Sequence, residues 1–349
     1  MAYISFQPSD FYNTTLYTGT GAEHAVTGVG FSADFTWNKA RSNTENNNLW
    51  DTPRTAGYGL RSDATTAEFS TAQGLKSWQS DGFTMGTNGS VNGSAATFAS
   101  YNWKGGTTTG IDTTGSTITP SAYSFSATAG ISIVKYYGDG VSGRKIPHGL
   151  GVAPEIVIVK ILNGTGSWDI VSKYTGATYY FRLDTTGAKA TGTWAFNDTL
   201  PDSVNFTVGD NAETNSSNGN IAYSFASIKG FSKIGSYTGN SDSNGPFIFT
   251  GFRPAYVMIK NVDESQAWNT WNNKMSTSGK NVADKNLQPN ATTAEQTSVS
   301  GVKEIDLVSN GFKIRGNNTE INNSGQTHVY TAFAEFPFVS SNSKAGTAR

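Results

Sequence analysis

Apolar and polar positions alternate in short runs separated by turn residues, and this pattern predicts β-strands along the whole chain. Residues 155–162 form an almost continuous apolar, β-branched run, which is typical of a strand buried on both faces, and residues 256–259 repeat it. In residues 221–227 the period is two, with aromatic and aliphatic side chains on one face and small ones on the other, which favours a sheet packed on one side. Helical periodicity is weak everywhere, including residues 65–75 and 291–300, so we expect an all-β fold.

The strand pattern recurs three times along the chain. Residues 28–39, 149–160 and 250–260 each combine a glycine turn with a strand that ends in a lysine, at Lys39, Lys160 and Lys260. A second block recurs around Phe83, Phe206 and Phe312, and aromatic strands that run into glycine turns recur at residues 16–21, 134–140 and 234–239. Because the first two blocks keep nearly the same separation, we predict three tandem antiparallel β domains. Short strands with frequent turn signals favour a β-sandwich or a barrel for each of them.

The repeat sets the predicted domain boundaries. We expect an N-terminal arm (1–13), three β-sandwich repeats (14–104, 131–229 and 230–338), a linker or connecting strand between the first two (105–130), and a C-terminal tail (339–349). The arm carries four aromatic residues: Tyr3, Phe6, Phe11 and Tyr12. Because exposed aromatic side chains are unfavourable, we expect the arm to dock on a neighbouring subunit of a homo-oligomer.

Composition narrows the class of protein. Lys and Arg number 25 and Asp and Glu 26, a net charge of −1, which argues against a nucleic-acid partner and against attraction to anionic membranes. Charged residues make up only 15% of the chain while aromatic residues reach 12%, the reverse of a disordered segment. Cysteine is absent, which excludes disulfides, thiolate metal sites and a cysteine nucleophile. We see no signal peptide and no apolar run long enough to cross a bilayer, so we expect no membrane insertion.

Tryptophans and acidic or amide residues follow the strand-ending lysines at equivalent places in the repeats. Aromatic rings beside a few polar groups are the usual equipment of a sugar-binding surface. The candidate ligand-binding residues are therefore Trp50, Asp51, Trp168, Asp169, Asp263, Trp268 and Trp271. The alternative interpretation is that these tryptophans begin the next strand and face the core.

Metal binding and catalysis have weaker support. The loops around Asp139 and Asp242 offer oxygen ligands for calcium, but neither has an EF-hand pattern, and we predict no metal or other cofactor. His24 and His148 lie in equivalent turns, which indicates loop residues rather than a catalytic base. A carboxylate pair could hydrolyse a glycan, but no spacing pairs the candidates Asp34, Asp51, Glu68 and Asp81. We therefore predict no catalytic residue and no enzyme.

Several segments resemble a repeat found in virion structural proteins of marine tailed bacteriophages, which are often described as tail or tail-fibre proteins. The resemblance is carried by residues 16–19, 28–41, 50–54, 80–83 and 101–104, by residues 146–154, and by residues 336–342. It implies a concanavalin- or laminin-G-like jelly-roll sandwich, and it brings no catalytic residue with it. The second repeat departs from the pattern, because Phe206 lacks the preceding Asp-Gly of the first.

Together these observations predict a non-enzymatic virion protein, assembled in the host cytoplasm. Its expected role is that of a tail or fibre component that contacts the host surface, with surface glycan as the candidate ligand. Weak contacts would be multiplied over repeats and over copies of the chain. Its other expected partners are further virion proteins. The alternatives are a capsid decoration or tail-stabilising protein without receptor binding, and a polysaccharide depolymerase.

Overall fold

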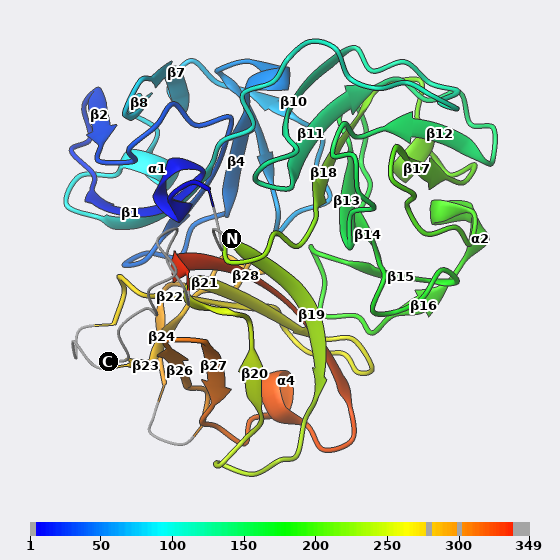
Figure 1. The fold of residues 1–349 in the computed structure, drawn as a ribbon. Coiled ribbons are helices and arrows are strands. Elements are labelled where there is room, and N and C mark those ends of the chain that lie inside the picture. The colour runs from blue at the N-terminus through cyan, green and yellow to red at the C-terminus, as the bar shows by residue number, and fades with distance from the viewer. Residues whose placement is uncertain (1–4, 277–280, 299–301, 338–349) are drawn as a thin grey trace.

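The computed structural model describes residues 5–276, 281–298 and 302–337, and nearly all regular structure in them is β. The predicted all-β fold is confirmed. The strands form three lobes around a common centre, coloured blue to cyan, green, and yellow to red in Figure 1. We call them unit 1 (β1 to β9), unit 2 (β10 to β18) and unit 3 (β19 to β28). The described helices are single turns, none of them long or apolar enough to cross a lipid bilayer.

Unit 1 has a large antiparallel sheet of order β1-β9-β3-β4-β5-β6 and a small sheet of order β2-β8-β7. The large-sheet strands are β1 (Tyr12–Thr18), β3 (Phe35–Ala40), β4 (Asn48–Asp51), β5 (Tyr58–Arg61), β6 (Phe69–Ser70) and β9 (Thr97–Trp103). The small-sheet strands are β2 (His24–Thr27), β7 (Leu75–Gln79) and β8 (Gly82–Met85). Short helices are η1 (Pro8–Asp10), η2 (Thr52–Arg54) and α1 (Gly89–Asn92).

Unit 2 has a large sheet of order β10-β11-β18-β13-β14-β15-β16 and a small sheet of β12 and β17. The large-sheet strands are β10 (Ala122–Ser126), β11 (Ile131–Tyr136), β13 (Ile156–Ile161), β14 (Trp168–Ser172), β15 (Tyr179–Arg182), β16 (Ala190–Thr191) and β18 (Asn220–Phe225). The remaining elements are β12 (Arg144–Pro147), β17 (Asn205–Val208), α2 (Thr193–Phe196) and α3 (Ala212–Asn215).

Unit 3 has a large sheet of order β19-β28-β21-β22 and a smaller one of order β20-β27-β26-β23. The large-sheet strands are β19 (Ser232–Thr238), β21 (Phe252–Asn261), β22 (Asn269–Asn272) and β28 (Thr327–Pro337). The smaller sheet contains β20 (Phe247–Phe249), β23 (Val282–Ala283), β26 (Ile305–Val308) and β27 (Gly311–Ile314). The pair β24 (Lys285–Asn286) and β25 (Gln296–Thr297) and the helix α4 (Thr319–Asn322) complete it.

The large sheets of the three units share one pattern of strand pairing. In each, a late strand lies between an early strand and a central strand: β9 between β1 and β3, β18 between β11 and β13, and β28 between β19 and β21. The registers also match, because Phe35 faces Trp103, Ile156 faces Phe225, and Tyr256 faces Phe333. These registers define equivalent positions in the units, which we use below.

Both faces of each large sheet are covered. One face packs on the small sheet of its own unit, and the other faces a central core to which all three units contribute. All of β13 is therefore buried, as its apolar run predicts. The one-sided packing predicted from residues 221–227 is wrong, because Ala222 and Ser224 on the small-residue face are also buried, beneath the small sheet.

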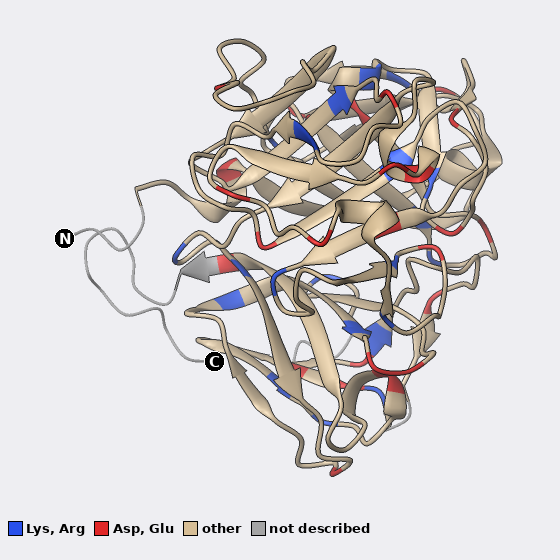
Figure 2. Ribbon diagram, turned by 90° about the vertical axis from the view of Figure 1, so that its right-hand side faces the viewer, with Lys and Arg blue, Asp and Glu red and all other residues tan. Residues whose placement is uncertain are grey.

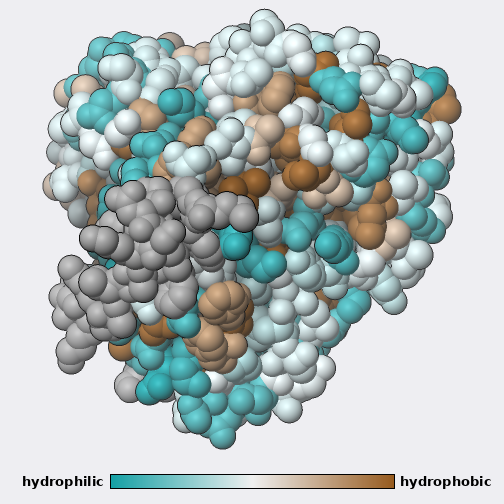
Figure 3. All heavy atoms as spheres, viewed as in Figure 1, coloured by the Kyte–Doolittle hydropathy of each residue, from teal (hydrophilic) through white to brown (hydrophobic). Residues whose placement is uncertain are grey.

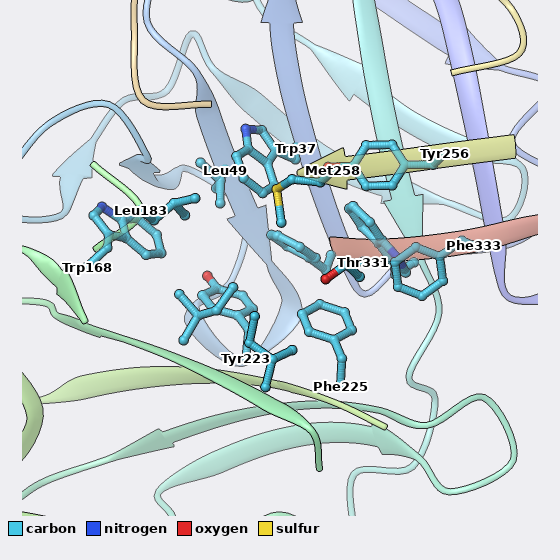
Figure 4. Close-up of a pocket in the computed structure, with 14 residues that line it drawn as sticks. Trp37, Leu49, Trp168, Leu183, Tyr223, Phe225, Tyr256, Met258, Thr331 and Phe333 are labelled. Atoms are coloured by element: carbon cyan, nitrogen blue, oxygen red, sulfur yellow. The ribbon is translucent and has the colours of Figure 1, made fainter. Parts of the chain in front are cut away.

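Aromatic and aliphatic side chains from all three units meet in the central core (Figure 4). Phe35, Tyr223 and Tyr256 come from units 1, 2 and 3, and the ring centroids of Phe35 and Tyr223 lie 4.7 Å apart. A void of about 20 Å³ remains, with an almost entirely apolar lining. Since that is roughly the space of one water molecule, this void is a packing defect and not a ligand site.

The N-terminal arm packs on its own chain. The rings of Phe6 and Phe11 lie 4.9 Å apart, and Phe6 lies 5.4 Å from Phe231 of unit 3. Tyr12 begins β1 and stacks on Phe333 at 5.1 Å. Phe6, Phe11 and Tyr12 therefore have partners within their own chain, and Tyr3 lies outside the described residues. Docking of the arm on a neighbouring subunit stays a prediction.

The segment predicted as a linker or connecting strand belongs to unit 2. It supplies β10 to the large sheet, and Ile111 and Ile118 pack against the unit 2 core. On the surface, basic and acidic residues are interspersed over the units (Figure 2). Hydrophobic and hydrophilic residues are likewise mixed over the face shown in Figure 3.

Candidate functional site

The three strand-ending lysines lie buried at the seams between units. Lys160 of unit 2 donates hydrogen bonds from Nζ to the backbone oxygens of Thr65 in unit 1 (3.0 Å) and of Gly166 (2.7 Å). At the equivalent places, Lys39 donates to the backbone oxygen of Thr292 and Lys260 to that of Thr186. Burial lowers the pKa of each lysine to about 8. The lysines therefore join each unit to one neighbour.

The seam contacts form a closed cycle. Trp168 of unit 2 donates from Nε1 to the backbone oxygen of Arg61 in unit 1, and Trp268 of unit 3 does the same to Arg182 of unit 2, each at 2.9 Å. Asn47 takes this position in unit 1 and donates from Nδ2 to the backbone oxygen of Gln288 in unit 3 at 3.0 Å. Each unit therefore gives and receives the same contact, as in a ring with threefold symmetry.

None of the four candidate tryptophans presents a ring to solvent. Trp50 and Trp271 lie in the cores of units 1 and 3, and Trp168 and Trp268 lie at the seams, all at most 1% exposed. A surface ligand has no access to these rings, and their environment matches the alternative in which they face the core.

The candidate acidic residues of this set are engaged within the protein. Asp51 is fully buried, where it pairs with Arg54 at 2.7 Å and accepts a hydrogen bond of 2.6 Å from the Tyr223 hydroxyl of unit 2. Asp263 pairs with Lys189 across the seam between units 3 and 2. Asp169 belongs to a larger polar cluster in unit 2.

The remaining carboxylates and histidines have structural partners. Glu68 shares Arg54 with Asp51, Asp34 accepts hydrogen bonds from Thr52 and Gly105, and Asp81 accepts from the backbone of two turn glycines. The side chain of His148 is buried and lies 3.1 Å from the backbone oxygen of Asp202. His24 packs edge-on against the Tyr17 ring.

The two calcium candidates lie in separate loops. Asp139 pairs with Arg144, and Asp242 accepts a hydrogen bond from the backbone of Asn244. Across residues 5–276, 281–298 and 302–337, no group of three or more His, Cys, Asp or Glu side chains is placed to hold a metal ion.

The polar cluster that reaches the surface lies in unit 2 and joins three elements. Arg182 of β15 donates from Nε to Asp169 of β14 at 3.0 Å and from Nη2 to Glu213 of α3 at 2.7 Å. Asp169 is fully buried, whereas the side chains of Glu213 and Arg182 are 20% and 31% exposed. Burial, together with the neighbouring Glu213, raises the pKa of Asp169 to about 7. The cluster thus carries little net charge at neutral pH.

Two partly exposed aromatic side chains flank this cluster. Tyr180 and Trp194 meet edge to face with their centroids 4.5 Å apart. The Arg182 guanidinium carbon lies 5.5 Å from the Tyr180 centroid and 5.7 Å from the Trp194 centroid, within cation–π range. A Cβ atom on Gly192 would lie 2.4 Å from the Trp194 indole nitrogen, so the chain needs glycine there for the ring to sit as it does.

We define the unit 2 cluster as Asp169, Tyr180, Arg182, Trp194 and Glu213. Only Asp169 was among the candidates named from the sequence. The other four lie on three elements, Tyr180 and Arg182 on β15, Trp194 on α2 and Glu213 on α3, whose packing the pattern of residues does not reveal, so no short motif marks them. Arg182 bridges Asp169 and Glu213.

The family DUF7483, described as a domain of unknown function, matches residues 7–337. The chain belongs to this family. The matched region spans all three units, so the DUF7483 domain corresponds to the whole ring and not to one unit. Curated proteins and solved structures gave no match.

Proposed function

We propose that this DUF7483 protein is a non-enzymatic structural protein of a phage particle, a tail or fibre component that contacts the host surface. The resemblance of its segments to virion repeats supports the location. The observation that supports a non-enzymatic role is that the candidate acidic, basic and aromatic side chains form ion pairs, hydrogen bonds and packing contacts within the protein. The seam lysines, Trp168 and Trp268 join the units, Trp50 and Trp271 lie in the cores of units 1 and 3, and Asp51 pairs with Arg54.

A closed ring suits display on a particle. Its three seams fix the surface loops relative to one another, so binding a partner requires little further ordering of the chain. Several copies on one particle would multiply weak contacts with the host.

Deletion of the gene, combined with labelling of the protein on purified particles, tests the proposal. We expect label on the tail and a loss of adsorption to host cells from particles that lack the protein. Normal adsorption with reduced particle stability would instead favour the decoration or stabilising role. Release of reducing ends from host polysaccharide by the purified protein would favour a depolymerase, and absence of the label from particles would refute the virion location.

A further inference from the structure

The unit 2 cluster differs from the equivalent positions of the other two units. Where unit 2 has Asp169 beside Glu213, unit 1 has Asn48 beside Ser90 at 3.4 Å and unit 3 has Asn269 beside Glu320 at 2.6 Å. Asparagine at this position is therefore compatible with the fold, since the other two units have it. Unit 2 instead buries a carboxyl group next to a second one, which is more costly than burying an amide.

The edge-to-face pair of Tyr180 and Trp194 also differs from unit 1, where a single ring, Phe69, lies 4.8 Å from the guanidinium carbon of the equivalent Arg61. Strand pairing makes Tyr180 equivalent to Gly59 of unit 1. The backbone oxygen of Trp194 accepts a hydrogen bond from the nitrogen of a helix-capping asparagine, a position held by Gln73 in unit 1 and Val302 in unit 3. The fold therefore forms without these two rings. Unit 2 thus differs from the other two units at three neighbouring residues: two partly exposed aromatic residues and the buried Asp169.

We propose that the unit 2 cluster binds a neutral saccharide. The Tyr180–Trp194 pair offers an apolar surface for the C–H groups of a sugar ring. Arg182 uses Nε and Nη2 within the cluster, and Nη1 has no protein acceptor in the part of the chain that the structure describes. Nη1 and the exposed edge of Glu213 supply a donor and an acceptor for neighbouring sugar hydroxyls.

The charge of the unit 2 cluster favours a neutral sugar over an anionic one. Arg182 is already paired with two carboxyl groups, so the cluster has no excess positive charge to attract a sulfate, phosphate or uronate. Asp169 acts as a positioning residue, because it lies beneath the surface and holds the guanidinium beside the two rings. This inference deepens the proposed function, since it names the class of host ligand and the place where it binds.

The test uses the full chain on an array of immobilised neutral oligosaccharides, with heparin and a uronate polymer as anionic probes. Trp194→Gln installs the residue that unit 1 has at the equivalent position, Gln73. Tyr180→Asn installs the residue that unit 3 has there, Asn286, because Leu287 pairs with Thr270 as Phe181 pairs with Ile170. Both variants are therefore compatible with the fold. Tyr58→Asn is the matched control, because Tyr58 is an exposed tyrosine of unit 1 at 44% exposure and lies outside the cluster.

We expect the wild type to bind at least one neutral oligosaccharide. Trp194→Gln and Tyr180→Asn should each weaken that binding roughly tenfold in calorimetric titration, while Tyr58→Asn leaves it unchanged. The proposal is overturned if the wild type binds no neutral glycan, if it binds only the anionic probes, or if Tyr58→Asn weakens binding as much as Trp194→Gln. Circular dichroism melting confirms that each variant is folded.

Phage particles that carry Trp194→Gln test the saccharide site and the virion role separately. Normal adsorption by labelled mutant particles would refute the saccharide site as the host contact but keep the virion role. Conversely, neutral glycan binding by a protein that is absent from particles would keep the site and refute the virion role.

Discussion

The Lys160 amine of unit 2 donates a hydrogen bond of 3.0 Å to the backbone oxygen of Thr65, which lies 95 residues earlier in unit 1. The same bond links Lys39 to Thr292 and Lys260 to Thr186. The three bonds run in one direction around the ring, so that unit 1 receives from unit 2, unit 2 from unit 3, and unit 3 from unit 1. The chain is thus organised like a cyclic trimer whose units are covalently joined.

The buried lysines predict a rise of stability with pH. Their pKa of about 8 lies below the value of ~10.4 for an unfolded chain, so between these values the folded protein binds fewer protons than the unfolded one. The free energy of unfolding should therefore increase from pH 8 to pH 10, by up to roughly 3 kcal/mol for each lysine. Urea denaturation at pH 7.5, 8.5 and 9.5 measures this slope.

Lys160→Met should reduce that slope, because it removes one of the titrating groups. Lys76→Met is the control, since Lys76 is 38% exposed and pairs with Glu23 at the surface. An equal slope in wild type and Lys160→Met would show that the buried amine does not titrate in this range.

Asp169 should make the free energy of unfolding fall with rising pH, opposite to the effect of the buried lysines, and Asp169→Asn should remove that fall. The pKa of Asp169, raised to about 7, lies above the ~3.9 of an unfolded chain, so its contribution to stability is present at low pH and is lost as pH rises through 7. We expect the variant to resemble wild type near pH 4 and to be more stable than wild type at pH 8. The urea midpoint at both pH values gives the result.

Asp263→Asn is a control for which we expect the opposite change in stability at pH 8. Desolvation of Asp263 is outweighed by hydrogen bonds from Lys189 and Thr327, which lower its pKa, so its removal should destabilise the protein at pH 8. If Asp169→Asn were destabilising at pH 8 by a similar amount, Asp169 would be a conventional ion-pair partner.

The repeated strands and their lysines could be predicted from the sequence, but the partners of those lysines were not. A repeat that would have indicated them begins at Asp63, Asp184 and Asn290, where the chain reads Asp or Asn, one residue, Thr, Thr or Gly, Ala, and then Glu or Lys. The third residue of each copy supplies the backbone oxygen that the neighbouring unit's lysine binds.

The orientation of the tryptophans could not be predicted for a physical reason. A period of two separates the faces of a strand, but it identifies a solvent face only when one face is polar and exposed. Here Trp50 and Leu49 point to opposite faces of β4, and both are buried, one in the unit 1 core and the other in the central core. The clustering of Asp169 with Glu213 depends on the pairing of separate strands, which periodicity does not specify.

The N-terminal arm should contribute to the stability of the chain itself. Phe11 packs against Phe6 at 4.9 Å and against Phe231 at 6.3 Å between ring centroids, and it is partly buried. Phe11→Ala should lower the free energy of unfolding by about 1–3 kcal/mol and leave the oligomeric state unchanged. Urea denaturation and light scattering test both expectations. A change of oligomeric state without loss of stability would instead indicate the intersubunit docking predicted from the sequence.

Asn215 should be among the side chains whose loss most destabilises unit 2. It is 1% exposed at the end of α3, where its Nδ2 donates to the backbone oxygens of Val141 (2.9 Å) and Gly209 (2.7 Å), and its Oδ1 accepts from the nitrogen of Asp139 (3.0 Å). Asn92 and Asn322 make the same three bonds in the other units. Each asparagine thus fixes the loop that follows β1, β11 or β19 to the helical turn of its unit.

Asn215→Ala leaves three backbone groups without their partner, and we expect it to lower the free energy of unfolding by about 3 kcal/mol. Asn215→Asp keeps the acceptor but places a carboxylate against two carbonyl oxygens, so its destabilisation should be larger at pH 7 than at pH 3. Asn218→Ala, at an exposed position three residues later, is the control and should change stability by less than about 0.5 kcal/mol. Equal losses for Asn215→Ala and Asn218→Ala in urea denaturation would show that the loop is held by other contacts.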